Sequence, residues 1–358
     1  MTKNITLIIV FFLLLNSLNA QTRKYSNEFL AIGVGARALG MSNVQVASVE
    51  DATSGYWNPA GLLGVKSKMQ FALMHSEYFA GIAKYDYGSF ATPLDSSSAL
   101  GISFIRFGVD NIPNTTELID ANGNINYDRI TSFSAADYGF LLSYAKKTPI
   151  KGLTLGANAK VIYRLIGDFA KSWGFGLDAG VQYRYGKWQF GAMARDITST
   201  FNAWSFTLSD QMKEVFILTG NEIPENSLEI TLPKLILGAA RKYDIKERFS
   251  VLAEVNCDMT FDRKRNVLIK SDVASVDPHL GLEIGYLNFA FLRAGIGNFQ
   301  QVPDIEDKVT TGFQPNIGVG VRLKGFTIDY ALTDIGDQSV ALYSNVFSLK
   351  IDINRQSK

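Results

Sequence analysis

The feature that most constrains this chain is the alternation of apolar and polar residues along most of its length. A period of two places successive side chains on opposite faces of a β-strand. The alternation is clearest in residues 153–166 and continues in residues 173–185 and 313–323. In the first of these stretches one face carries Leu153, Leu155, Ala157, Ala159, Val161, Tyr163 and Leu165. The sequence therefore predicts an all-β protein.

The two faces of these strands differ in a way that indicates a membrane. The apolar face of residues 173–185 begins with Trp173 and Phe175, ends with Tyr183 and Tyr185, and holds small and aliphatic residues between these two aromatic ends. An apolar band with aromatic residues at both edges is typical of strands that face lipid. After the first twenty residues, no apolar run reaches the roughly 18 residues that a membrane-spanning helix needs. We therefore predict a transmembrane antiparallel β-barrel rather than a soluble sandwich.

The alternating segments predict the size of this barrel. We expect about fourteen strands, an even number as in bacterial single-chain barrels, and most are long enough to cross a membrane when tilted. The segments are residues 68–76, 80–91, 99–108, 134–146, 153–166, 173–185, 187–196, 234–243, 248–257, 277–287, 289–298, 312–323, 325–332 and 341–352.

The lengths of the connections support this assignment. Four long connections all fall at one end of the predicted barrel, namely 109–133, 197–233, 258–276 and 299–311. The other end has mostly short turns, of which 92–98 is the longest. Outer-membrane barrels have long extracellular loops and short periplasmic turns. We therefore expect the long loops outside the cell and both termini in the periplasm.

The first twenty residues predict export. Lys3 precedes an apolar run from Ile5 to Leu18, and small residues precede Gln21. This is the pattern of a secretory signal peptide. The expected organisation is a signal peptide at 1–20, an N-terminal plug or hatch at 21–66 and an outer-membrane barrel at 67–358.

The plug is predicted from a stretch that does not alternate. Residues 25–64 contain glycines 33, 35, 40, 55, 61 and 64. A barrel of about fourteen strands encloses more space than its own side chains fill, so we expect this stretch in the lumen. Arg37 lies between Ala36 and Ala38 and would need a partner if buried. The candidate partners on inward faces are Asp178, Glu254, Glu283 and Asp329.

Two motifs in this stretch resemble the N-terminal signature of the PorV/PorQ family. They are GVGARALGM at 33–41 and VASVEDATSGYWNPAGLL at 46–63. Ser42 and Asn43 stand where a glycine often follows the methionine in such sequences. The residues that match the family motif are Gly35, Ala36, Arg37, Gly40, Met41, Trp57, Asn58, Pro59 and Ala60.

The resemblance implies a fatty-acid-transporter-like outer-membrane barrel of Bacteroidetes, with fourteen strands and an N-terminal hatch. Several members of the family serve the type IX secretion system. The implied partners are outer-membrane lipid and other secretion proteins, or the C-terminal signal domains of secreted cargo. A role in binding or shuttling such proteins at the cell surface is the first functional prediction.

Little in the sequence favours catalysis. His75 and His279 are the two histidines and do not have the spacing of a metal site. No nucleophile-elbow sequence is present, so we predict no enzyme activity and no cofactor or metal. Basic and acidic residues nearly balance, 35 against 34, so nucleic acid is not an expected partner. The single cysteine, Cys257, excludes an intramolecular disulfide.

One outer loop has oxygen-bearing residues at alternate positions, from Asp120 to Asp128. Calcium loops have this spacing, but here the glycine is displaced and the twelfth position is Thr131 instead of glutamate. A polar turn is the favoured interpretation.

The predicted loop 197–233 offers a candidate surface for a partner. It contains Phe201, Trp204, Phe206, Phe216, Ile217 and Leu218. Apolar patches of this kind mark interaction sites, although the loop could also fold over and bury them. The alternative function is a channel for hydrophobic small molecules. The inward faces carry Gly, Asn, Gln, Lys, Arg and Asp, which favours protein handling over a lipid path.

Overall fold

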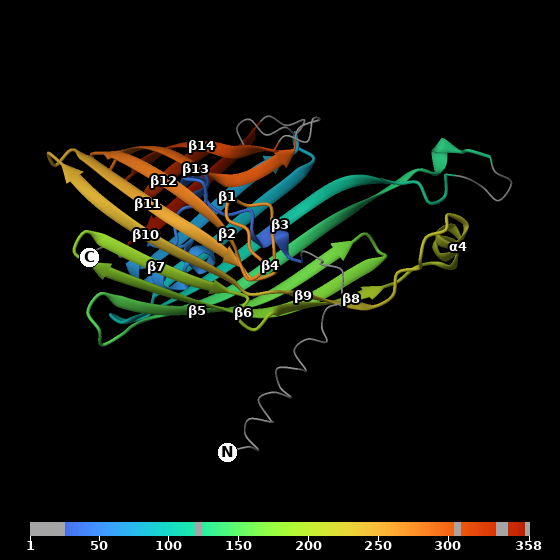
Figure 1. Ribbon diagram of the computed structural model, residues 1–358, viewed down its shortest axis with the longest axis horizontal. Coiled ribbons are helices and arrows are strands. Elements are labelled where there is room, and N and C mark those ends of the chain that lie inside the picture. The colour runs from blue at the N-terminus through green and yellow to red at the C-terminus, as the bar shows by residue number, and fades with distance from the viewer. Residues whose placement is uncertain (1–25, 119–123, 304–308, 334–342, 355–358) are drawn as a thin grey trace, which may run out of the picture.

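The computed structural model describes residues 26–118, 124–303, 309–333 and 343–354. Its strands form a closed antiparallel barrel of fourteen, as predicted (Figure 1). The ring consists of β1 (Met69–Tyr78), β2 (Ala83–Pro93), β3 (Ser98–Asn114), β4 (Thr131–Lys147), β5 (Leu153–Ile166), β6 (Ala170–Tyr185), β7 (Trp188–Arg195), β10 (Lys234–Ile245), β11 (Phe249–Thr260), β12 (Ser275–Tyr286), β13 (Ala290–Pro303), β14 (Val309–Leu323), β15 (Phe326–Thr333) and β16 (Ser344–Ile353).

Neighbouring strands in the chain pair along almost the whole ring. The exceptions are β1, which pairs with β16, and β7, which pairs with β10. The predicted strands agree with these elements closely, and residues 153–166 are the same in both. Among the described residues, no helix is long and apolar enough to cross a membrane.

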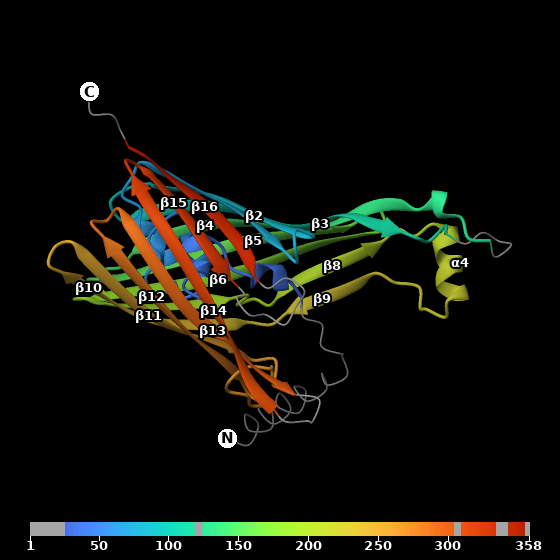
Figure 2. The same cartoon turned by 90° about the horizontal axis from the view of Figure 1, so that it is seen from above.

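The prediction of a loop at 197–233 was wrong. This stretch forms β8 (Thr200–Phe206), α4 (Asp210–Leu218) and β9 (Ser227–Thr231). The chain turns between β7 and β8, where Asp196 and Ser199 have positive φ of 55° and 57°. The strand β8 then pairs with residues 170–175 of β6, and β9 pairs with β8. These elements and the β3–β4 hairpin project from the same end of the barrel (Figures 1 and 2).

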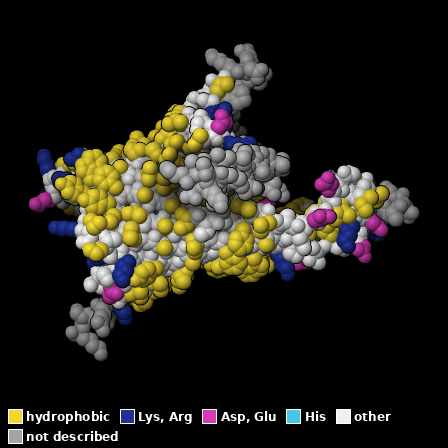
Figure 3. All heavy atoms as spheres, turned by 60° about the horizontal axis from the view of Figure 1, so that its bottom comes forward, with side chains coloured by type: hydrophobic (Ala, Val, Ile, Leu, Met, Phe, Trp, Pro, Cys, Tyr) yellow, Lys and Arg dark blue, Asp and Glu magenta, His cyan; other side chains and the backbone are white. Residues whose placement is uncertain are grey.

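The faces of the wall have the predicted polarity. Trp173, Phe175 and Leu177 are 45–49% exposed and point outward. The alternate residues of β6, such as Asp178, are buried on the inner side. Hydrophobic side chains cover much of the barrel face that Figure 3 shows. An exposed apolar band around a closed barrel is the surface of a protein that lies in lipid.

The N-terminal segment, residues 26–64, lies inside this ring (Figure 1). It contains four short helices: η2 (Glu28–Leu30), α2 (Ala36–Leu39), α3 (Ser54–Trp57) and η3 (Pro59–Gly64). Asn58 caps η3 by accepting a hydrogen bond from the Ala60 N–H, and Pro59 starts it. The segment is almost entirely buried. It therefore forms a core for a barrel whose wall alone could not fill its interior.

Inward glycines of the wall let this segment come close. A Cβ atom at Gly156 of β5 would lie 2.3 Å from the Ala60 backbone nitrogen. A Cβ atom at Gly180 of β6 would lie 2.2 Å from Asn58 Oδ1. Both distances are shorter than van der Waals contact, so only glycine fits at these positions without a shift of the turn at 58–60.

The described part of the N-terminal segment starts at the end of the barrel opposite to that where β16 ends, and the two chain termini, expected in the periplasm, lie outside the described residues. Ser26 donates a hydrogen bond to Glu229 of β9 over 3.1 Å, at the end with the long hairpins. Ile353 of β16 pairs with Met69 at the short-turn end. The N-terminal segment thus begins near the long hairpins and reaches the wall at the short turns.

Candidate functional site: a lumenal cavity above the N-terminal segment

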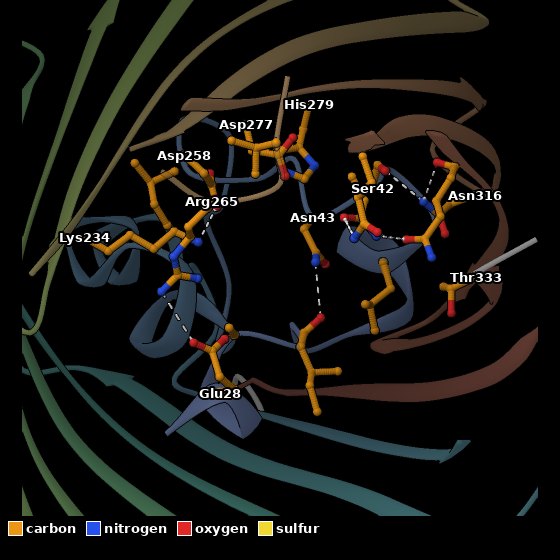
Figure 4. A pocket seen from close by; sticks show the side chains of 18 of the residues that line it. Glu28, Ser42, Asn43, Lys234, Asp258, Arg265, Asp277, His279, Asn316 and Thr333 are labelled. Atoms are coloured by element: carbon orange, nitrogen blue, oxygen red, sulfur yellow. Dashed lines mark hydrogen bonds and ion pairs between the residues drawn. The ribbon is translucent and has the colours of Figure 1, made fainter. Parts of the chain in front are cut away.

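A cavity of about 640 Å³ lies in the lumen. Its floor is the N-terminal segment, which contributes Ile32, Leu39 and Trp57. Its walls are inward side chains of β7 and β10 to β15, and residues 265–267 of the β11–β12 connection border it (Figure 4).

Paired charges line one side of the cavity. Lys234 Nζ lies 2.6 Å from Asp258 Oδ2, and His279 Nε2 lies 3.2 Å from Asp277 Oδ2. These residues meet because β10, β11 and β12 are neighbours and Asp258 is directly opposite Asp277. A wall of this kind suits polar rather than purely hydrocarbon ligands.

A second charged group connects the β11–β12 connection to the N-terminal segment. Arg265 Nη2 lies 2.7 Å from Asp262 Oδ2. The same nitrogen lies 3.6 Å from Glu28 Oε1, and Figure 4 shows this pair. Burial opposes the charge of Asp262, but hydrogen bonds and charge from Arg265 outweigh it and keep the pKa of Asp262 below its usual value. The connection is therefore held to the floor of the cavity by charge.

Arg195 differs from the other cations of the cavity. It is partly buried at the end of β7, and no carboxylate of the described residues lies within ion-pair distance of it. Its Nη1 and Nη2 donate to the carbonyls of Leu30 and Tyr56, each over 3.1 Å. The guanidinium lies 4.4 Å from the ring centre of Tyr56. Of its five N–H groups, therefore, two have acceptors in the described part of the chain.

Apolar side chains border Arg195 on the floor. Trp57 is 4% exposed, and its indole N–H donates to the Val34 carbonyl over 2.9 Å. Leu39 and Ile236 also line the cavity. A positive charge next to an apolar surface is the arrangement that an amphipathic anion requires.

A smaller cavity of about 280 Å³ lies at the short-turn end of the lumen, with Arg37 on its border. Arg37 Nε lies 2.8 Å from Glu283 Oε2. Arg293 then connects Glu283, over 2.7 Å, to Asp329, over 2.8 Å. Since α2 borders both cavities, passage between them would require this segment to move.

Of the four candidate partners of Arg37, the structure thus selects Glu283. Asp178 instead pairs with Lys160 over 2.8 Å. Glu254 accepts a hydrogen bond from the Ala47 backbone N–H over 2.8 Å. The alternation predicts which side chains of a strand face inward. It does not predict which of them pairs with Arg37, because it does not give the height of each side chain along the barrel axis.

The other residues of the N-terminal motif hold the segment to the wall. The backbone N–H of Gly35 points at Met74 Sδ over 2.9 Å. Asn58 Nδ2 donates to the carbonyls of Val46 and Val181, over 3.0 and 2.9 Å. Gly40 packs against the backbone of Gly318, where a Cβ atom would lie 2.9 Å from Gly318 Cα.

The six apolar residues of the predicted partner-binding loop are separated by the fold. Phe201 points outward from β8 and packs against Phe175 with the two rings tilted, so it continues the lipid-facing band. Trp204 is buried under Arg164, and Phe206 stacks on Trp204. The remaining three, Phe216, Ile217 and Leu218, are on α4.

Groups of three or more potential metal ligands are absent from the described residues. Asp120 to Gly123 of the calcium-like loop lie outside them, while Asn126 caps the short helix η4 (Tyr127–Arg129). His75 is on the outer surface of β1, 2.7 Å from Asp86, and is separate from His279. Arg195 was not among the residues predicted from the sequence. Its position on the inward face of a strand would have indicated a charged side chain in the lumen.

No family model and no curated protein matches this sequence. Solved structures do match. The CymD monoaromatic hydrocarbon channel has a TM-score of 0.55 at 12% identity, over 91% of this chain and 99% of that one. The toluene transporter TodX of P. putida has a TM-score of 0.55 at 14% identity, over 90% and 99%. A FadL homologue of Pseudomonas aeruginosa has a TM-score of 0.50 at 12% identity, over 90% and 98%.

The chain has the FadL-like fold. Identities this low show the shape of the barrel and bring no substrate with them. The resemblance to the PorV/PorQ family is supported only at the level of this FadL-like barrel, and the comparisons do not support a link to type IX secretion or to Bacteroidetes.

Proposed function

We propose that this protein is an outer-membrane channel for small amphipathic molecules that have an apolar body and a negatively charged end. This is the alternative function predicted from the sequence, with a narrower class of substrate. The observation that carries it is Arg195, a cation without a carboxylate partner among the described residues, at the border of a 640 Å³ cavity.

The cavity also explains why a plain hydrocarbon is not the proposed substrate. Lys234, Asp258, Asp277 and His279 would be desolvated without compensation by an apolar ligand that filled the cavity. A ligand whose charged end meets Arg195 and whose apolar part lies on Trp57 leaves these pairs hydrated. The structural relatives named as toluene and monoaromatic hydrocarbon channels support small-molecule passage through this fold.

The test is equilibrium binding of decanoate and decanol to the protein in lipid nanodiscs, with empty nanodiscs as the control for partition into lipid. The wild type should bind decanoate more tightly. Arg195→Gln should weaken decanoate binding about tenfold, since a hydrogen-bonded charge contributes about 1.5–3 kcal/mol. Binding of decanol should not change. Arg129→Gln, on the exposed helix η4, is the matched control.

If neither ligand binds above the empty nanodiscs, the channel proposal is wrong. If both bind and Arg195→Gln changes neither, the cavity is used but Arg195 does not select the ligand. Resistance of the variant to trypsin shows whether the N-terminal segment is still in place.

A second candidate function, binding of a secretion partner or cargo domain, is favoured by α4 alone. Ile217 and Leu218 of this helix are 65% and 84% exposed at the end with the long hairpins. Pull-down from detergent extracts with wild type and with Ile217→Ser/Leu218→Ser would test it. If wild type and the double variant recover the same proteins, α4 is not a binding surface and no longer supports this second function.

A further inference from the structure

A lipid-facing arginine at the short-turn end of the barrel has an unusual environment. Arg241 of β10 lies between two aromatic rings, 4.8 Å from the ring centre of Trp188 and 4.6 Å from that of Tyr243. Trp188 is directly opposite Arg241 on β7, and Tyr243 is two residues further along β10. The rings restrict the guanidinium to one position on the wall.

The outward direction of this side chain follows from its neighbours. Leu237 and Tyr243 are on the same face of β10 and are 42% and 40% exposed. Trp188 is also 40% exposed. Further exposed aromatic residues, Tyr185, Phe249 and Tyr286, are at the same end of adjacent strands. Such a belt marks the interface between lipid tails and headgroups.

Arg241 lacks a counter-ion in the described part of the chain. No Asp or Glu oxygen lies within ion-pair distance of it, and its buried Nε has no hydrogen-bond acceptor. A buried N–H without an acceptor carries a cost in free energy, because it has lost its hydrogen bonds to water. An acceptor that is not part of the described residues would remove this cost, and on this face the neighbouring molecule is lipid.

The charges around Arg241 favour an anionic acceptor. Lys187, Lys246 and Arg248 are exposed in the adjoining turns, and none has an ion pair among the described residues. Of the acidic residues nearby, Asp244 lies 4.0 Å from Lys242, and Glu247 has no ion pair within the part of the chain that the structure describes. Exposed lysines recur around this end: Lys68 directly before β1, Lys146 near the end of β4 and Lys324 in the turn between β14 and β15.

We propose that Arg241 binds the phosphate of an anionic phospholipid in the leaflet around the short turns. The guanidinium presents parallel N–H groups to two phosphate oxygens, and Trp188 and Tyr243 hold its plane. The surrounding lysines attract a headgroup with net negative charge. Since basic residues recur around the circumference, they fit a membrane leaflet better than one compact acidic protein. This site is on the outside of the wall and is independent of the lumenal cavity.

The experiment is titration of the delipidated protein in a neutral detergent with phosphatidylglycerol, with retained lipid counted by native mass spectrometry. Arg241→Gln should weaken phosphatidylglycerol binding about tenfold. Arg248→Gln removes the same charge from a residue that does not lie between Trp188 and Tyr243, and it should weaken binding no more than about twofold. Arg241→Lys should lie between wild type and Arg241→Gln, because it keeps the charge and loses the planar fork.

Three results would overturn the proposal. The first is retention of phosphatidylglycerol by folded Arg241→Gln at the level of wild type. The second is an equal loss in Arg248→Gln, which would indicate a diffuse field of charge instead of a site. The third is displacement of the lipid by excess inorganic phosphate, which would make this a site for free anions. Circular dichroism of each variant shows that the barrel remains folded.

Discussion

At the scale of single residues, the interior is held by a few buried charges that each serve two partners. Glu283 accepts hydrogen bonds from both Arg37 of the N-terminal segment and Arg293 of the wall. Arg293 in turn reaches Asp329. A buried charge is stable only when it is paired and hydrogen-bonded. Loss of Glu283 thus has a larger effect than loss of Arg37, since it leaves more charges without partners.

We expect Glu283→Gln to lower the free energy of unfolding by about 3–5 kcal/mol, the range for a broken buried ion pair. Arg37→Met should cost less, because Glu283 keeps Arg293. Urea unfolding in lipid vesicles measures both. A larger loss for Arg37→Met than for Glu283→Gln would contradict the shared role of Glu283.

At the scale of elements, the contact between the turn at 58–60 and the strands β5 and β6 depends on glycine. Gly156→Ala would place a Cβ atom 2.3 Å from the Ala60 nitrogen. The variant should form the barrel but hold the N-terminal segment loosely, and trypsin should then cut at Arg37. Gly88→Ala is the control, since a Cβ atom there would lie 3.7 Å from Leu73. Equal resistance of the two variants to trypsin would show that the close approach is not needed.

The β2–β3 turn has a pH-dependent element. Asp95 accepts hydrogen bonds from the Ser98 hydroxyl and from the backbone N–H and hydroxyl of Ser97, over 2.6–2.8 Å. These bonds hold the pKa of Asp95 well below its usual value. Because the pKa of Asp95 is lower in the folded than in the unfolded protein, the ionised carboxylate stabilises the fold at any pH above the unfolded-state pKa of about 3.9. This stabilisation is lost as the pH falls from there toward the pKa of the folded state.

Wild type should therefore be more stable than Asp95→Asn at neutral pH, and the difference should shrink at about pH 3. Urea midpoints of both proteins at the two pH values measure this. A difference that stays constant with pH would mean that the charge of Asp95 does not contribute.

At the scale of the whole molecule, two exposed leucines should behave differently. Leu142 of β4 is 54% exposed in the lipid-facing band, and Leu218 of α4 is 84% exposed beyond it. Leu142→Arg should cost about 2–4 kcal/mol, as for an arginine near the bilayer midplane. Leu218→Arg should change stability by no more than about 0.5 kcal/mol. The free energies of unfolding of both variants in lipid vesicles test this. Similar losses of stability in Leu142→Arg and Leu218→Arg would contradict the placement of the barrel in lipid.

The sequence alone predicted most of the barrel, because alternation is a local signal that each strand carries for itself. Residues 153–166 show this, since predicted and observed bounds agree. β8 and β9 were missed because the break at Asp196 interrupts the alternation and the stretch then reads as a loop. The cavity around Arg195 could not be predicted, since it depends on which strands lie opposite the N-terminal segment.

The enclosed N-terminal segment has a consequence for the order of assembly. The Ala36 N–H donates to Ser348 Oγ, across 312 positions of the chain, and the Asn58 amide reaches the middle of β6. Contacts this distant in sequence form late. The ring closes where β16 meets β1. The contacts of the N-terminal segment with β16 must therefore wait until this last strand arrives, so a truncation that removes β16 should leave residues 26–64 more exposed to protease.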